Sequence, residues 1–137
     1  MKYAGFSLLF LLLGTLIYCT CRQDVIFLLP LQGSELLEAI KIDIHYKGNP
    51  LIYFFLFCLS DALWYLALLM IQLKLCDGSL FMKFLFGLSI ALPFIWELWQ
   101  RLNPMLGTFD WFDIFTYLLT LIIFMLCVKR KRLHQFL

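Results

Sequence analysis

Four apolar stretches, each close to the length of a membrane-spanning helix, dominate this sequence. They cover residues 4–21, 51–73, 80–100 and 112–128 of a 137-residue chain that is 64% hydrophobic. A bilayer core needs roughly 20 consecutive apolar residues in a helix, whereas a soluble domain is nearer to half apolar. A run such as LIYFFLFCLSDALWYLALLMI does not alternate as a barrel strand does, so its backbone groups must pair within helices. We therefore predict an all-α polytopic membrane protein: one domain, residues 1–137, forming a bundle of four transmembrane helices.

The first stretch is also compatible with a signal peptide, because Lys2 precedes a long apolar core. A cleavage site prefers small residues. Tyr18 stands directly before Cys19, and Thr20 directly before Cys21, with no such pattern at either place. This favours a first helix that is retained.

Basic residues indicate the orientation of the spans, because they stay on the cytoplasmic side. Seven basic residues lie at the two ends of the chain or in the connection near residue 78: Lys2, Lys74, Lys83, Lys129, Arg130, Lys131 and Arg132. Four lie in the other two connections: Arg22, Lys41, Lys47 and Arg101. We expect a multi-pass membrane protein with both termini cytoplasmic. The basic tail then anchors the chain on anionic membrane lipids, and we do not expect nucleic-acid binding.

The first outer connection, residues 22–50, is too long for a simple turn. Within it, SELLEAIKIDI places Leu36, Leu37, Ile40 and Ile44 on one helical face after the capping residue Ser34. This pattern predicts a short amphipathic helix on the outer surface between spans 1 and 2.

The five cysteines and two histidines do not have the spacing of metal ligands, so we expect no metal site and no cofactor.

Polar residues inside the apolar stretches are the candidates for function, because a carboxylate within a span is costly and faces the protein interior or a water-filled cavity. Asp61 lies ten residues into the second stretch. In the third, Glu97 and Gln100 continue one helical face from Ser89 and Pro93. In the fourth, Asp113, Thr116, Tyr117 and Thr120 follow the same rule. We predict that these stripes converge in an acidic pocket open to the outside.

Two aspartates precede the fourth stretch in GTFDWFDIF. Asp110 has the position of a helix N-cap, and Asp113 then falls at the third helical position, as in a capping box. Both carboxylates also suit the positive end of the helix dipole. Capping alone is therefore one explanation of Asp110, whereas Asp113 also heads the polar stripe.

The segment ELWQRLNPMLGTFDWFDIFTY resembles the VanZ-like family of small bacterial membrane proteins, with Glu97, Gln100, Gly107, Asp110 and Asp113 at the matching positions. SDALWYLALLM is similar to the aspartate-bearing second helix of that family. The resemblance implies a divergent member with a four-helix layout, located in the bacterial cytoplasmic (inner) membrane. It also implies a role in the bacterial cell envelope, linked to glycopeptide resistance.

These observations lead to one expected function and two alternatives. The first is an envelope protein whose pocket binds a polar or lipid-linked cell-wall component, with Asp61, Glu97, Gln100, Asp110, Asp113, Thr116 and Tyr117 as the candidate binding residues. The second is an intramembrane aspartyl hydrolase, in which two carboxylates share a proton. The third is a small ion-coupled carrier or a regulatory subunit. The sequence fixes neither a catalytic residue nor the oligomeric state.

Overall fold

The computed structural model describes residues 2–21, 49–75, 78–103 and 109–128, and every secondary-structure element within them is helical. The elements are α1 (Lys2–Cys21), α3 (Pro50–Tyr53), the π-helical segment η2 (Phe54–Cys58), α4 (Leu59–Leu75), α5 (Leu80–Leu102) and α6 (Trp111–Cys127). Since α3, η2 and α4 follow one another without a break, the second apolar stretch forms one continuous helical rod. The helices therefore lie where the four apolar stretches predicted them. The predicted outer helix within residues 22–50 and the turn at Gly107 fall outside the described residues.

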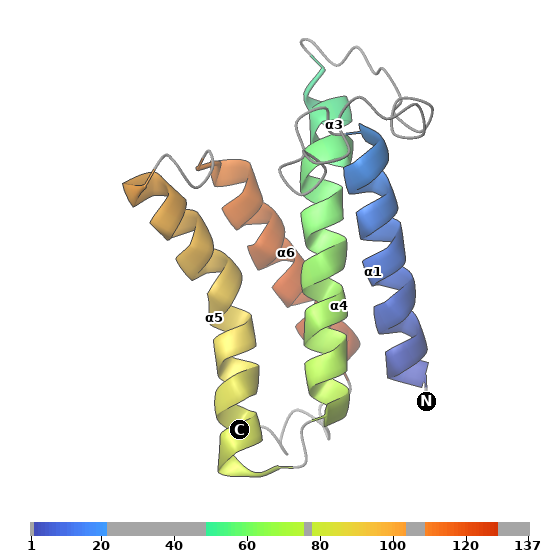
Figure 1. Cartoon of the computed structure of the whole chain (residues 1–137), viewed down its shortest axis with the longest axis vertical. Helices are drawn as coiled ribbons and strands as arrows, with labels where there is room; N and C mark the ends of the chain where they lie inside the picture. Colours follow the sequence, from blue (N-terminus) through green and yellow to red (C-terminus); the bar gives the residue numbers. More distant parts are fainter. Residues whose placement is uncertain (1, 22–48, 76–77, 104–108, 129–137) are drawn as a thin grey trace, which may run out of the picture.

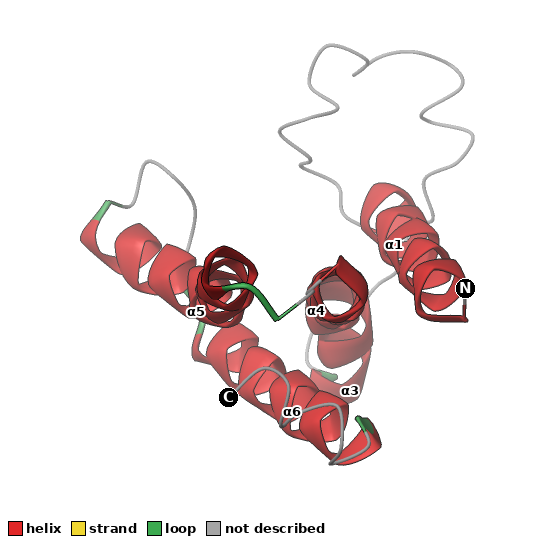
Figure 2. Ribbon diagram, turned by 90° about the horizontal axis from the view of Figure 1, so that it is seen from below, coloured by secondary structure: helices red, strands yellow, loops and turns green. Residues whose placement is uncertain are grey.

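The four rods run alternately up and down (Figure 1). The start of α1 and the end of α6 lie at the same end of the molecule, as expected for four alternating rods. α4 is the central helix: α1 packs against one side of it, and α5 and α6 pack against the other (Figure 2). In the described part of the chain, α1 has no comparable contact with α5 or α6.

The apolar core lies between α4, α5 and α6. Its buried members are Tyr65, Leu69, Leu73, Phe86, Phe124 and Val128. Above this core, Tyr65, Phe94 and Tyr117 form an aromatic layer that joins the three helices through edge-to-face contacts, with ring centroids 5.6–6.4 Å apart. The Tyr65 hydroxyl donates to the carbonyl of Ile90 at 3.1 Å, so α4 and α5 are also linked by a hydrogen bond.

α1 and α4 meet along a seam of small residues. The buried Ser7 donates through Oγ to the carbonyl of Ala67 at 2.8 Å. Seven residues on, Gly14 lies against Trp64 and the Ser60 carbonyl, so closely that a Cβ there would stand 2.7 Å from Trp64 Cδ1. A spacing of seven keeps both residues on one face of α1 and lets the two backbones approach closely.

Trp64 closes the upper part of this seam. Its indole N–H donates to Thr15 Oγ1 at 3.2 Å, and its ring lies 4.8 Å from that of Tyr18. Thr15 and Tyr18 of α1 thus hold the Trp64 side chain of α4 in place. These contacts fix how α1 packs against α4.

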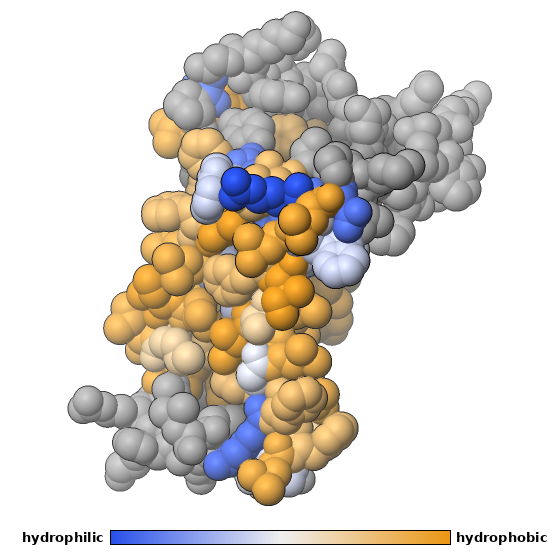
Figure 3. Space-filling model, turned by 90° about the vertical axis from the view of Figure 1, so that its left-hand side faces the viewer, coloured by the Kyte–Doolittle hydropathy of each residue, from blue (hydrophilic) through white to orange (hydrophobic). Residues whose placement is uncertain are grey.

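The outside of the described structure is largely apolar. Large hydrophobic side chains are exposed along α1, α5 and α6, including Leu12, Phe84, Leu92, Phe115 and Ile122. The face of α5 is hydrophobic over its middle, with hydrophilic residues gathered toward both ends (Figure 3). Two helices, Ala4–Cys21 and Leu80–Leu102, are long and apolar enough to cross a membrane, and α6 is an apolar helix of slightly shorter length.

The ends of α5 and α6 follow from local chemistry. Gly78 takes a positive φ of 86° in the turn before α5, and Ser79 caps that helix by accepting from the N–H of Met82. Pro93 lies inside α5 and removes one backbone donor. α5 changes direction near its middle, as the proline predicts (Figure 1).

Candidate functional site

The predicted polar stripes of α5 and α6 face inward. Ser89 and Glu97 are buried on α5, and Thr116 and Thr120 are buried on α6. Together with Asp61 on α4, these residues come from three helices that pack against one another. The charged members lie at the end of the molecule opposite to the start of α1. We call this region the acidic end, defined by Cys58, Asp61, Glu97, Asp110, Asp113 and Thr116.

Glu97 joins α5 to the start of α6. Its side chain is only 3% exposed, and its carboxylate oxygen Oε2 accepts a long hydrogen bond of 3.5 Å from the backbone N–H of Asp110. The N-terminus of a helix carries unsatisfied N–H groups and a partial positive charge. Glu97 therefore stabilises the start of α6 from a neighbouring helix, and α6 in turn helps to hold a buried carboxylate.

Asp110 is the N-cap of α6, as the sequence predicts. Its Oδ1 accepts from the backbone N–H of Phe112 at 2.9 Å, and Asp113 lies in the first turn. In a capping box, the side chain at the position of Asp113 accepts from the N-cap backbone N–H. Here Glu97 accepts from that N–H, so the reciprocal contact comes from α5.

Cys58 is the residue of this region that sequence reasoning does not single out, because its spacing from the other cysteines and histidines does not fit a metal site. It is 0% exposed at the last position of η2. The carboxylates of Asp61, Asp110 and Asp113 all act electrostatically on its thiol. The side chain of Cys58 thus lies within electrostatic range of carboxylates from both α4 and the start of α6.

The π-helical turn is what places Cys58 there. A π-helical turn holds one more residue than an α-helical turn and is frequent at functional sites. It changes which residues of the α3–α4 rod face α6 above and below Cys58. The hydrophobic sequence FFLFC gives no sign of such a turn, so the position of Cys58 could not be predicted; its spacing of three from Asp61 was the available signal.

Thr116 has an unusual environment. Its side chain is 2% exposed, and Oγ1 has no partner that meets hydrogen-bond geometry. It interacts with the Cys58 thiol, which is a weak partner at best. Buried hydroxyl groups nearly always have a hydrogen-bond partner, so Thr116 is a polar group whose place in the fold is not explained by its protein neighbours.

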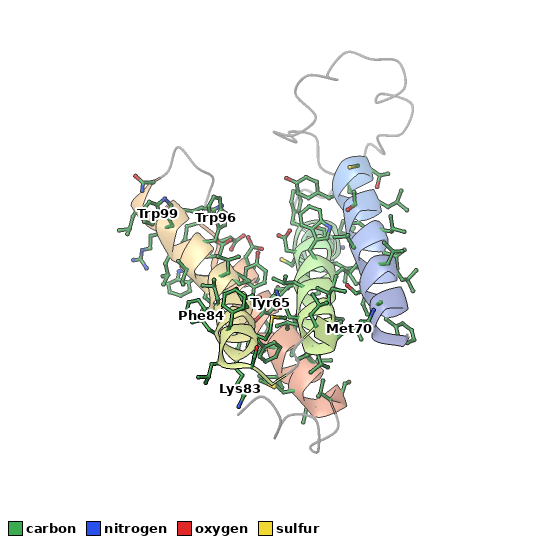
Figure 4. All side chains as sticks on the ribbon, turned by 60° about the horizontal axis from the view of Figure 1, so that its bottom comes forward. Tyr65, Met70, Lys83, Phe84, Trp96 and Trp99 are labelled. Carbon is green, nitrogen blue, oxygen red and sulfur yellow. The ribbon has the colours of Figure 1, made fainter. Side chains whose placement is uncertain are left out.

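The remaining predicted residues lie around this cluster. Tyr117 belongs to the aromatic layer on the inner side of the acidic end, where it contacts Tyr65 and Phe94. Gln100 is half-buried near the end of α5. Trp96 and Trp99 are exposed at the same end of α5, with Lys83 near the opposite end of that helix (Figure 4).

Arg101 is the described basic residue nearest to Glu97 along α5. Its guanidinium group lies over the rings of Phe109 and Trp111, at 5.4 and 5.8 Å from their centroids. This cation–π arrangement binds the end of α5 to the residues that lead into α6.

Two further observations concern metal ligands and cavities in the described part of the chain. Among the described residues, no group of three or more His, Cys, Asp and Glu side chains is arranged to hold a metal ion. A groove of about 470 Å³ lies elsewhere, between α1 and α4, and is lined by apolar groups such as Leu11, Ala67 and Ile71.

Comparison with known proteins gives no relative: no family model, no characterised sequence and no solved structure matches this chain.

Proposed function

We propose that this chain is a four-span integral membrane protein of the bacterial cell envelope, and that its acidic end binds a polar or lipid-linked envelope component from the outer side. The observation that carries the proposal is the placement of four carboxyl groups from three helices in one part of an otherwise apolar bundle: Glu97 of α5 accepts from the backbone N–H of Asp110, and Asp61, Asp110 and Asp113 are all within electrostatic range of Cys58.

The distribution of side chains supports a membrane environment. Leucine and phenylalanine side chains point outward along α1, α5 and α6, whereas Ser7, Ser60, Ser89, Glu97, Thr116 and Thr120 are buried. An exterior of this kind would associate or aggregate in water, but it suits lipid, where polar groups must turn toward the protein. Four alternating rods bring the start of α1 and the end of α6 to one side, and the positive-inside rule supports a cytoplasmic location for that side.

The placement of charges supports an outer site. Lys74 and Lys83 lie at the end of the molecule where α1 begins, while Glu97 and Asp110 lie at the other end. On the proposed topology, the acidic end therefore opens toward the outer face. The resemblance of residues 97–113 to the VanZ-like family supports the same conclusion, because Glu97, Asp110 and Asp113 are the residues that carry it. It also suggests the phenotype to measure, which is resistance to glycopeptides.

The test is expression in a glycopeptide-susceptible host, with growth measured against teicoplanin. We expect wild type to lower susceptibility and the double variant Glu97→Gln/Asp113→Asn to lose the effect. Lys83→Gln, at the opposite end of α5, is the control and should behave like wild type. The protein level in the membrane is measured for each variant. Equal resistance from wild type and the double variant, at equal membrane levels, would sink the proposal.

A further inference from the structure

The hydroxyl of Thr116 is the starting point, since its burial lacks an explanation within the fold. A buried polar group without a partner costs about 1–3 kcal/mol. Thr116 Oγ1 is in this position, although valine would fill the same space without the cost. The Cys58 thiol beside it is a weak partner, so a stronger partner from outside the chain would satisfy the hydroxyl.

The direction of the side chain shows where that partner would lie. Side chains of an α-helix lean toward its N-terminus. Thr116 therefore leans toward Asp113, one turn earlier on the same face of α6. Its contact with Cys58 places it beside the thiol on which Asp61, Asp110 and Asp113 act. The hydroxyl thus lies on the side of α6 that carries Asp113, beside the Cys58 thiol.

The charge of this region selects the kind of partner. The carboxylates of Asp61, Asp110 and Asp113 favour a cation, and Glu97 adds a fourth negative charge beside Asp110. A metal ion requires several ligands around one point, and the described residues do not form such a group. An organic cation needs less convergence, because each of its N–H donors can find a separate acceptor.

We infer that the acidic end binds a primary ammonium group, with Asp113 and Glu97 supplying the counter-charge and Thr116 Oγ1 accepting one of its three N–H donors. This inference rests on the proposed function, and it names the chemical class of the ligand. Tyr117, the residue after Thr116, belongs to the aromatic layer with Tyr65 and Phe94, and aromatic rings favour a cation over an anion.

A primary ammonium group has two sources at the outer face: a lipid head group and a water-soluble amine. The experiment separates them with the full-length protein in nanodiscs. In phosphatidylglycerol discs, ethanolamine is added and the unfolding temperature is followed. In discs that mix phosphatidylglycerol with phosphatidylethanolamine, native mass spectrometry counts the phosphatidylethanolamine that remains bound. Choline and phosphatidylcholine, which have no N–H donor, serve as the matched probes.

We expect ethanolamine or phosphatidylethanolamine to bind saturably, and the choline probes to bind at least tenfold more weakly. Thr116→Val should weaken binding about tenfold, because a hydrogen bond to a charged group is lost. Without ligand the same variant should be as stable as wild type or more stable, which a purely structural hydroxyl would not allow. Thr120→Val, one turn further along α6 and also buried, should bind like wild type.

Equal binding of the ethanolamine and choline probes, or full affinity in Thr116→Val, would overturn the inference. So would the absence of binding by both amine probes. The proposed function has a separate readout: if the resistance phenotype still depends on Glu97 and Asp113 while neither amine binds, the ammonium site is wrong and the outer acidic site stands. If both readouts fail, both proposals fail.

Discussion

The seam between α1 and α4 allows a prediction from a single methyl group. In Gly14→Ala, the new Cβ would lie 2.7 Å from Trp64 Cδ1, 2.9 Å from Trp64 Nε1 and 3.0 Å from the carbonyl oxygen of Ser60. Carbon atoms in contact normally stand about 3.5–4.0 Å apart. The indole ring or the helix must therefore move by close to an ångström.

The surroundings of Trp64 make that movement costly. The ring is held by its hydrogen bond to Thr15 at 3.2 Å and by the ring of Tyr18 at 4.8 Å. The third close atom is the backbone carbonyl of Ser60, which does not rotate away. Overpacking of this kind costs about 1–3 kcal/mol. Replacement of glycine by alanine in a helix regains at most about 1 kcal/mol, so we expect a net loss of stability.

Gly5→Ala is the matched control. Gly5 lies on the same helix, and a Cβ there meets no atom within 4 Å. This variant keeps the gain in helix propensity without the clash. The difference between the two variants therefore isolates the packing cost, which should be about 1–3 kcal/mol. The measurement is reversible unfolding of the purified full-length chain in mixed micelles of increasing SDS fraction, followed by tryptophan fluorescence.

A Gly14→Ala protein as stable as the Gly5→Ala protein would refute the close approach of α1 and α4. Mass spectrometry of the purified protein adds an independent check. If the first helix is retained, the measured mass includes residues 2–21. A mature protein that begins after Cys21 would show that the first helix is removed, and the seam would then have no part in the folded protein.

Three further predictions concern the other described contacts. Tyr65→Phe removes the hydrogen bond to the Ile90 carbonyl and should lower the stability in mixed micelles by about 0.5–1.5 kcal/mol; no change would show that the hydroxyl bonds elsewhere. Asp110→Ala removes the N-cap of α6 and should cost about 1 kcal/mol in the same assay, whereas Asp110→Asn, which keeps an acceptor, should cost less. On the proposed topology, an alkaline phosphatase reporter fused after Leu102 should be active and one fused after Leu75 inactive; the reverse result would place the acidic end in the cytoplasm.

The sequence predicts the helices well because their causes are local. Apolar length sets the extent of each rod, and Ser79 and Asp110 mark the starts of α5 and α6 as capping residues do. The inward faces of α5 and α6 also follow from spacing alone. Ser89 and Glu97 share one face of α5, and Thr116 and Thr120 share one face of α6, because each pair is spaced with the helical period.

Contacts between helices could not be predicted in the same way, because they depend on which faces meet. The seam between α1 and α4 depends on Ser7 and Gly14, which look unremarkable within a run of leucines until Trp64 is placed against them. The central position of Cys58 depends on a π-helical turn that its apolar sequence does not announce. Whether Thr116 Oγ1 has a hydrogen-bond partner depends on the positions of all the side chains around it, which the sequence does not give.

The packing of α1 along a single neighbour also bears on biosynthesis. On the proposed topology, α1 leaves the ribosome first and waits in the bilayer until α4 is made, since its partner begins after residue 50. Its leucine-rich surface is compatible with lipid, so α1 needs no protein partner at that stage. The rod that follows carries Ser60 and Asp61 and enters lipid less readily by itself, so it meets a helix that is already in place and later receives α5 and α6 over its polar side. The order of the spans along the chain therefore matches the order in which they require a packing partner: α1 can remain alone in lipid, whereas the polar rod that follows inserts beside a helix that is already present.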